Sequence, residues 1–227
     1  MFCDCCAPAR RGMLARRGFI AGASAAMLAA GRAARADDAV TPAAALAQLM
    51  DGNARFAARK LTSFDEDLAM LREQTTEQQR PFAAVLSCVD SRVPVELVFD
   101  QSIGHVFVAR VAGNICTPEI IASLEFGTEV LGAAVIMVLG HGGCGAVKAA
   151  IAGAAVPGQI SALYAPLRAA VERAGPDLVA TTRANARIQA NLLSTSSPVL
   201  ANRIHAGTLK VTAGYYDLGS GKVALLG

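Results

Sequence analysis

The stretch AVIMVLGHGGCG, residues 134–145, decides the fold of this chain. It begins with six apolar residues that lack helical periodicity, which is typical of a buried parallel strand. A glycine-rich turn containing His141 and Cys144 follows directly. A second stretch, FAAVLSCVDSR at 82–92, has the same arrangement, because its apolar run leads into Cys88 and neighbouring charged residues. Both stretches therefore predict a strand that ends at a group of reactive side chains.

Cys88, His141 and Cys144 form a ligand set that suits a catalytic zinc ion. Zinc binds thiolate and imidazole in a tetrahedron, and catalytic sites keep three protein ligands and leave the fourth position open. Parallel strands place ligands at their carboxyl ends, so the two clusters are expected to meet in one crevice. The turn also places Cys144 near a helix N-terminus, where exposed amides favour a thiolate. The sequence thus predicts a site for Zn²⁺.

These residues also allow simpler interpretations. A disulfide between Cys88 and Cys144 remains open at the level of sequence. Cys116 has no ligand partner nearby and is interpreted as a buried apolar thiol. Residues 140–145 match the dinucleotide pattern G-x-G-x-x-G, which requires an acidic residue after a second strand. The next acidic residue here is Glu172, in a helical stretch with no strand before it, so nucleotide binding is disfavoured.

Apolar runs alternate with helical patterns after residue 37, which predicts an α/β fold with a mostly parallel central β-sheet flanked by helices. The 191 residues of 37–227 fit one domain with a sizeable core. Thr41-Pro42 favours the start of an N-terminal helical arm. We expect strands at 82–88, 105–109, 134–139 and 209–217, and helices at 41–60, 67–79, 118–131, 144–152, 160–174, 177–194 and 198–205.

Residues 1–36 have the pattern of a twin-arginine signal peptide. Arginines at 16–17 precede an apolar stretch at 20–30, and a small-residue cleavage site follows at 34–36. The apolar stretch is shorter than the roughly 20 residues that span a bilayer. We therefore expect the domain at 37–227 to be exported in folded form to the periplasm, with no membrane anchor after cleavage.

Removal of this segment changes the charge and the cysteine count. The whole chain carries a net charge of +3, but residues 1–36 hold six Arg and one Asp, which leaves 15 basic and 17 acidic residues and a net charge of −2. This balance argues against a nucleic-acid partner. Cys3, Cys5 and Cys6 precede the twin arginines; Met13 is a more typical start, and a metal-binding tail is the alternative. The three remaining cysteines are too few for a disulfide framework.

At these motifs the chain resembles the β-class carbonic anhydrases. The family patterns C-x-D-S-R and H-x-x-C-G are present in full at 88–92 and 141–145. The similarity spans residues 41–227 and includes GNARF at 52–56, VARVAGN at 108–114, SLEFG at 123–127 and VTAGYYDLGSGKV at 211–223. The resemblance implies reversible hydration of carbon dioxide to bicarbonate and a proton, with Zn²⁺ as cofactor.

The resemblance also assigns roles to the two motifs. Cys88, His141 and Cys144 would hold the zinc, while Asp90 and Arg92 would form a catalytic dyad. Two thiolates neutralise the metal charge, so zinc here would activate its water less than a site with three histidines does. Asp90 would orient the nucleophile, and Arg92 would hold Asp90 with two parallel bonds. If Arg92 released it, Asp90 could become a fourth zinc ligand in a closed form.

Three more residues match family positions that contact substrate. Gln101 would contact bicarbonate, Phe126 would line the carbon dioxide pocket, and Gly145 would lie beside the substrate. In the family, Gln101 and Phe126 would come from across a dimer interface, which implies a homodimer or a dimer of dimers. Two alternatives remain. Carbonyl sulfide or carbon disulfide hydrolysis would use the same scaffold, and a zinc-binding module without turnover would better fit a chain that lacked Asp90 or Arg92.

Overall fold

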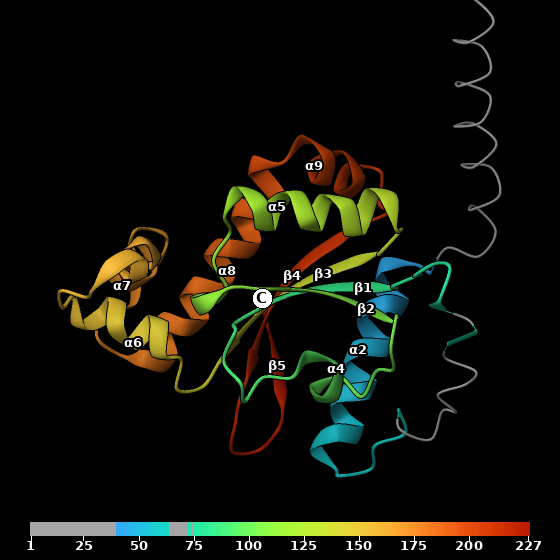
Figure 1. Ribbon diagram of the computed structural model, residues 1–227, viewed down its shortest axis with the longest axis horizontal. Coiled ribbons are helices and arrows are strands. Elements are labelled where there is room, and N and C mark those ends of the chain that lie inside the picture. The colour runs from blue at the N-terminus through green and yellow to red at the C-terminus, as the bar shows by residue number, and fades with distance from the viewer. Residues whose placement is uncertain (1–39, 64–71, 74) are drawn as a thin grey trace, which may run out of the picture. The chain divides into compact units, whose positions relative to one another are not determined.

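A computed structural model describes residues 40–63, 72–73 and 75–227 of the chain (Figure 1). The predicted signal peptide at 1–36 and, from the predicted helix at 67–79, residues 67–71 and 74 lie outside these residues. Within the described part of the chain, no helix combines the length and the apolar character needed to cross a membrane.

A five-stranded sheet forms the centre of the fold, in the order β2-β1-β3-β4-β5. Its strands are β1 (Ala83–Ser87), β2 (Val106–Arg110), β3 (Val135–His141), β4 (Lys210–Tyr216) and β5 (Val223–Leu226). The first four are parallel, as predicted, and β5 pairs antiparallel with β4. The sequence analysis missed β5, because this short edge strand buries only its two end residues and follows a tight turn.

Helices cover both faces of the sheet (Figure 1). Seven α-helices are described: α2 (Pro42–Ala57), α4 (Val95–Val98), α5 (Pro118–Glu125), α6 (Gly145–Ala152), α7 (Tyr164–Ala174), α8 (Leu178–Ser196) and α9 (Pro198–His205). Shorter turns are η1 (Ala112–Asn114), the π-helix η2 (Phe126–Val130) and the 3-10 helix η3 (Gly158–Leu163). Thr41 caps α2 by accepting a hydrogen bond from the Ala44 amide, with Pro42 in the first turn as predicted.

Alternate residues of each strand belong to two apolar layers. Ala84 and Leu86 of β1 pack with residues from α5, α8 and α9. Ala83 and Val85 point to the other face, where α2 and α4 supply the partners. This alternation follows from the two-residue period of a strand. Because both faces are covered, the strand interiors are apolar throughout, which is the pattern that the sequence shows at 134–139.

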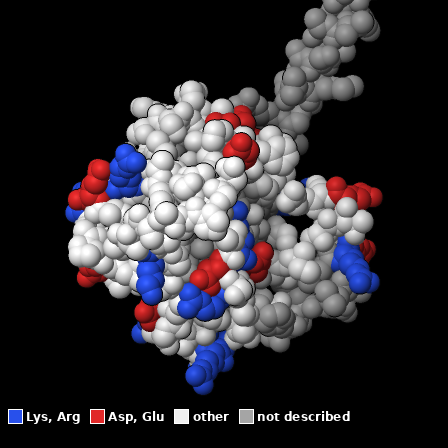
Figure 2. All heavy atoms as spheres, turned by 60° about the vertical axis from the view of Figure 1, so that its left-hand side comes forward, with Lys and Arg blue, Asp and Glu red and all other residues white. Residues whose placement is uncertain are grey.

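Helices α6 and α7 lie beside the sheet, on the left in Figure 1. This side comes forward in Figure 2, where small groups of both charge signs surround a broad area without charged side chains. The chain has no charged residue from 149 to 167, and Ile160 in this segment is 47% exposed.

The order of the strands determines where a ligand can bind. The chain passes from β1 to β2 on one side and then returns to place β3 on the other side of β1. In open α/β sheets, the crevice at the carboxyl ends of strands that diverge in this way is the usual binding site. Cys88 follows β1 directly, and His141 is the last residue of β3.

Candidate metal centre

The structure brings Cys88, His141 and Cys144 together. One potential ligand atom from each residue lies within 4.8 Å of the others, and all three residues are buried. Cys144 is the N-cap residue of α6, which agrees with the prediction that it lies at a helix N-terminus. The three residues that the two motifs nominate thus converge at the end of the sheet, as the strand pattern predicted.

The orientation of the His141 ring identifies its ligand atom. Nδ1 lies 3.0 Å from the Gly142 carbonyl oxygen, so it donates its proton there and leaves Nε2 as the acceptor. Nε2 is buried and has no hydrogen-bond partner among the described residues. A buried acceptor without a partner is costly in an apolar setting, whereas metal coordination would satisfy it. The donor set of two sulfurs and one imidazole nitrogen therefore fits Zn²⁺.

The two cysteines are free thiols, so the alternative interpretation as a disulfide is wrong. A hydrogen bond with Cys144 lowers the pKa of Cys88 to about 4, and the hydrogen bond from the Gly113 amide acts in the same direction. The contact with Cys88, together with burial, raises the pKa of Cys144. The lowered pKa of Cys88 favours its thiolate, which is the form that binds a divalent cation.

Cys116, the third described cysteine, is half-buried, and burial raises the pKa of its thiol to about 12. It is therefore a neutral thiol, as the sequence analysis expected.

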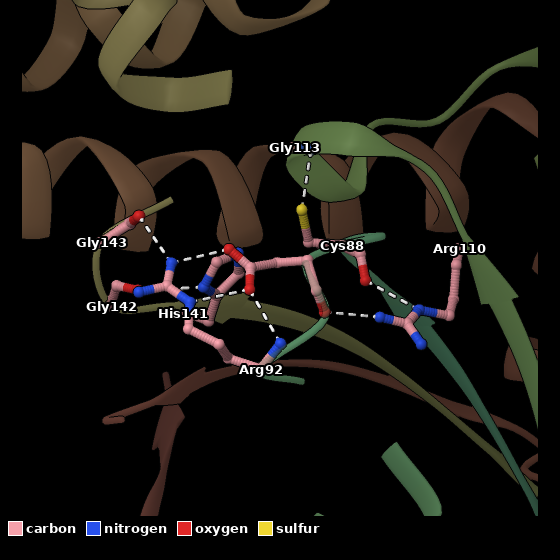
Figure 3. Close-up of polar contacts among 8 residues, drawn as sticks. Cys88, Arg92, Arg110, Gly113, His141, Gly142 and Gly143 are labelled. Atoms are coloured by element: carbon pink, nitrogen blue, oxygen red, sulfur yellow. Dashed lines mark hydrogen bonds and ion pairs between the residues drawn. The ribbon is translucent and has the colours of Figure 1, made fainter. Parts of the chain in front are cut away.

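Asp90 and Arg92 form a bidentate ion pair. Figure 3 shows Arg92 close to His141. Arg92 Nε donates to Asp90 Oδ1 at 2.9 Å, and one terminal nitrogen donates to Oδ2 at 2.7 Å. This guanidinium holds the pKa of Asp90 well below its usual range. Oδ2 also lies 4.0 Å from His141 Nε2. An ionised carboxylate is thus fixed beside the candidate metal position, with its charge compensated by Arg92.

Three further groups support this arrangement, and two of them belong to the backbone. The Gly143 carbonyl accepts a hydrogen bond from Arg92 at 3.2 Å, and the Gly113 amide donates to the Cys88 sulfur at 3.4 Å (Figure 3). Both groups are backbone atoms, which leave no side-chain signature in a sequence. Arg110 donates to the carbonyl oxygens of Cys88 and Asp90, so it braces the loop after β1.

The predicted substrate residues lie in three different elements. Gly145 is the first residue of α6, beside Cys144, and the space where a Cβ would project is open. Gln101 is 7% exposed and donates to the Phe99 carbonyl at 2.8 Å. Phe126 begins η2 and is 46% exposed. The single chain does not test roles that act across a dimer interface, so those of Gln101 and Phe126 stay predictions, as does that of Gly145.

Known proteins with similar sequences point to one family. Residues 83–223 match the family described as "Carbonic anhydrase". The carbonic anhydrase of Mycolicibacterium smegmatis is 35% identical over 195 residues, which cover 81% of this chain and 93% of that protein. Carbonic anhydrase 2 of Mycobacterium tuberculosis is 33% identical over 81% of this chain and 92% of its own length.

Solved structures agree with the sequence comparisons. The β-carbonic anhydrase CcaA superposes with a TM-score of 0.65 at 26% identity, over 79% of this chain and 86% of that one. The β-carbonic anhydrase CafA of Aspergillus fumigatus gives the same TM-score at 25% identity, over 81% and 89%. The family match at 83–223 includes both motifs, whose residues converge at the end of the sheet. The chain therefore belongs to the β-carbonic anhydrase family of zinc-dependent enzymes.

Proposed function

We propose that this protein catalyses the reversible hydration of carbon dioxide to bicarbonate and a proton at the centre formed by Cys88, His141 and Cys144. The observation that carries the proposal is the bidentate Asp90–Arg92 pair, whose Oδ2 lies 4.0 Å from the free Nε2 of His141. A purely structural metal site has a fourth protein ligand in place of the open position. It therefore needs no charged pair beside the metal. Family membership supports the same activity.

The residues at this centre have different roles. Cys88, His141 and Cys144 would hold Zn²⁺, which when bound supplies a water molecule made acidic enough to attack carbon dioxide at neutral pH. Asp90 would accept a hydrogen bond from the attacking group and orient it. Arg92 keeps Asp90 ionised and prevents the carboxylate from binding the metal as a fourth ligand, which would give the closed form.

Removal of one thiolate tests the metal assignment. Cys144→Ser should lose zinc and carbon dioxide hydration together, because a hydroxyl is a far poorer zinc ligand than a thiolate. Cys116→Ser is the matched control, since that thiol lies outside the ligand group, and it should keep both properties. Metal analysis and a hydration assay on the two purified variants measure the effect. Full zinc occupancy with normal turnover in Cys144→Ser would refute the assignment.

Carbonyl sulfide and carbon disulfide are the competing substrates. The relatives reported above carry the name carbonic anhydrase, which favours carbon dioxide. Assays of all three substrates on one preparation distinguish these activities. A preparation that hydrolyses carbonyl sulfide faster than it hydrates carbon dioxide would overturn the proposed substrate.

The proposed assembly is a homodimer or a dimer of dimers. Exposed apolar side chains support association: Ile103 is 58% exposed and Phe126 is 46% exposed. A related structure is described as one of two tetrameric β-carbonic anhydrases from Sordaria macrospora, with a TM-score of 0.64 at 22% identity. Light scattering on the eluting peak of a size-exclusion column gives the mass, and a monomer at micromolar concentration would contradict the proposal.

The proposed location is the periplasm, on the basis of the twin arginines and the cleavage pattern in residues 1–36. Changing both Arg16 and Arg17 to Lys should leave the protein in the cytoplasm with its leader uncleaved. Fractionation of cells that express either form measures the distribution. Undiminished periplasmic protein in the double variant would show that the segment is not read as a twin-arginine signal.

A further inference from the structure

A chain of buried polar contacts runs from helix α8 to the Cys88 sulfur. Asn185 and Gln189 lie one turn apart on α8 and are 0% and 1% exposed. Buried amide side chains require hydrogen-bond partners, and these two find most of theirs outside α8. The partners lie mainly in the loop that connects β2 with α5. Side chains on two consecutive turns of α8 therefore hold that loop in place by hydrogen bonds.

The two amides hold the loop at both ends. Asn185 Nδ2 donates to the Gly113 carbonyl at 2.8 Å, and Gln189 Oε1 accepts the backbone N–H of Cys116 at 2.8 Å. Gln189 Nε2 donates to Asn185 Oδ1 at 3.1 Å and to the Pro166 carbonyl at 3.3 Å. These last two hydrogen bonds determine the orientation of both amides: the Gln189 nitrogen donates, and the Asn185 oxygen accepts. Neither side chain can turn over without losing several hydrogen bonds.

The loop needs this external support because its backbone is unfavourable. Gly113 has φ +76° and Asn114 has φ +45°, so two consecutive residues occupy the left-handed region. Such a conformation costs energy for a residue other than glycine and persists only where the surroundings impose it. Asn114 is fully buried, and neither polar atom of its side chain has a partner among the described residues. Its own side chain therefore does not stabilise the turn.

The other side of the loop faces the ligand Cys88. The backbone N–H of Gly113 donates to its sulfur at 3.4 Å (Figure 3). A Cβ on Gly113 would lie 3.3 Å from the Ala146 Cβ, so the loop is also packed closely against α6. The Gly113 carbonyl is held by α8 while its amide points at the thiolate. A displacement of Gly113 away from Cys88 would lengthen and weaken the N–H···S bond.

We propose that Asn185 and Gln189 are positioning residues of the metal centre, which hold the loop so that the Gly113 amide donates to the Cys88 thiolate. An N–H···S bond withdraws electron density from the sulfur and fixes its direction, and groups of this kind typically change metal affinity about 10–100-fold. This inference rests on the proposed zinc site, and it concerns residues that contact neither metal nor substrate.

The test compares two asparagines of the same helix. Asn185→Ala removes the donor to the Gly113 carbonyl, whereas Asn191→Ala removes an exposed side chain of α8 and serves as the control. Each full-length variant is loaded with Co²⁺, and its thiolate-to-cobalt charge-transfer band is recorded. Loss of the N–H···S bond makes the sulfur a stronger donor, so the band should move to longer wavelength in Asn185→Ala only. Zinc affinity, measured by competition with a chelator, should fall about 10-fold.

A second variant separates positioning from general loss of stability. Asn185→Asp keeps the shape and the acceptor for Gln189 Nε2, but it places an oxygen against the Gly113 carbonyl. It should show the same spectral shift, even if Asn185→Ala does not fold. A cobalt band and a zinc affinity equal to those of the control in the variants that fold would overturn the proposal and leave the zinc site intact. Failure of the unmodified protein to bind zinc would instead overturn the proposed function.

Discussion

Asp90 with Arg92 and Asp100 with Arg55 are the same chemical pair in two different surroundings. Asp100 is fully buried, and its oxygens accept hydrogen bonds from Arg55, from the amides of Thr62 and Ser63, and from the Thr62 hydroxyl. Asp90 is 17% exposed and receives its hydrogen bonds from Arg92 alone. The first carboxylate is saturated with donors, whereas the second retains acceptor capacity on Oδ2 beside His141.

This difference in free acceptor capacity distinguishes a structural ion pair, Asp100–Arg55, from a reactive one, Asp90–Arg92. In both pairs the pKa of the carboxyl lies well below its usual range. Burial alone would raise the pKa of Asp100, but the hydrogen bonds from Arg55, Ser63 and Thr62 outweigh it. A lowered pKa therefore does not identify the functional carboxylate. What distinguishes Asp90 is an oxygen that faces the metal ligands with a lone pair still available.

The largest expected effect is the loss of activity in Arg92→Ala. The ligand trio is unchanged, so the variant should keep most of its zinc. Asp90 would be released to coordinate the metal, and kcat/KM should fall by about 10²–10³-fold, as when a preorganised group is removed. Arg55→Ala breaks the other pair and is the control, which should retain turnover and zinc.

Hydration kinetics at neutral and alkaline pH, with a structure of the Arg92→Ala variant, measure this effect. The variant should adopt the closed form even at high pH. Wild-type turnover together with an Asp90 that stays away from the ligands would show that the pair does not gate the site.

A smaller effect, on stability, is expected from Asp100→Asn. An amide cannot accept all the hydrogen bonds that the buried carboxylate receives, so part-buried donors lose their partners. The free energy of unfolding should fall by about 1–3 kcal/mol, while zinc content stays equal to that of the unmodified protein. Asp90→Asn should show the opposite pattern, with normal stability and little activity. Urea unfolding and metal analysis measure both, and equal destabilisation by the two changes would remove the distinction.

The Asp90–Arg92 pair could be predicted from the sequence and the Asp100–Arg55 pair could not, for a physical reason. Asp90 and Arg92 are two positions apart in the motif C-x-D-S-R, so the resemblance to the family implied that they form a pair. Asp100 and Arg55 are 45 positions apart, and only packing of α2 against the loop after α4 joins them. The left-handed backbone of Asp100, with φ +46°, also follows from that packing and has no local signal.

The same reasoning applies to the fold and to the metal centre. The central strands β1 and β3 are the easiest to predict, because they are buried along their whole length and their sequences are almost entirely apolar. The edge strand β5 and the short helix α4 could not be predicted, since neither has enough residues to show a period. At the centre, Cys88, His141 and Cys144 were found from their side chains. The Gly113 amide and the Gly143 carbonyl were not, because any residue supplies such groups.

The smallest expected effect is a difference in how acid affects the two carboxylates. Because the folded-state pKa of Asp100 is lower than the value of about 3.9 in an unfolded chain, its contribution to stability is present above that value and is lost as pH falls toward the folded-state pKa. The unfolding free energies of the unmodified protein and of Asp100→Asn should therefore differ by a constant amount between about pH 5 and 8. The difference should shrink steadily below about pH 4.

Acid also removes the metal from its thiolates, but it does so in both proteins alike, so the difference between them isolates Asp100. Urea unfolding at pH 3, 4, 5 and 7 gives the required values. Asp90→Asn is the comparison: the more exposed Asp90 is screened by solvent, so its difference curve should be flatter over the same range. An Asp90→Asn curve as steep as that of Asp100→Asn would mean that Asp90, too, stabilises the fold. The two pairs would then differ only in their distance from the metal ligands, not in the part they play in folding.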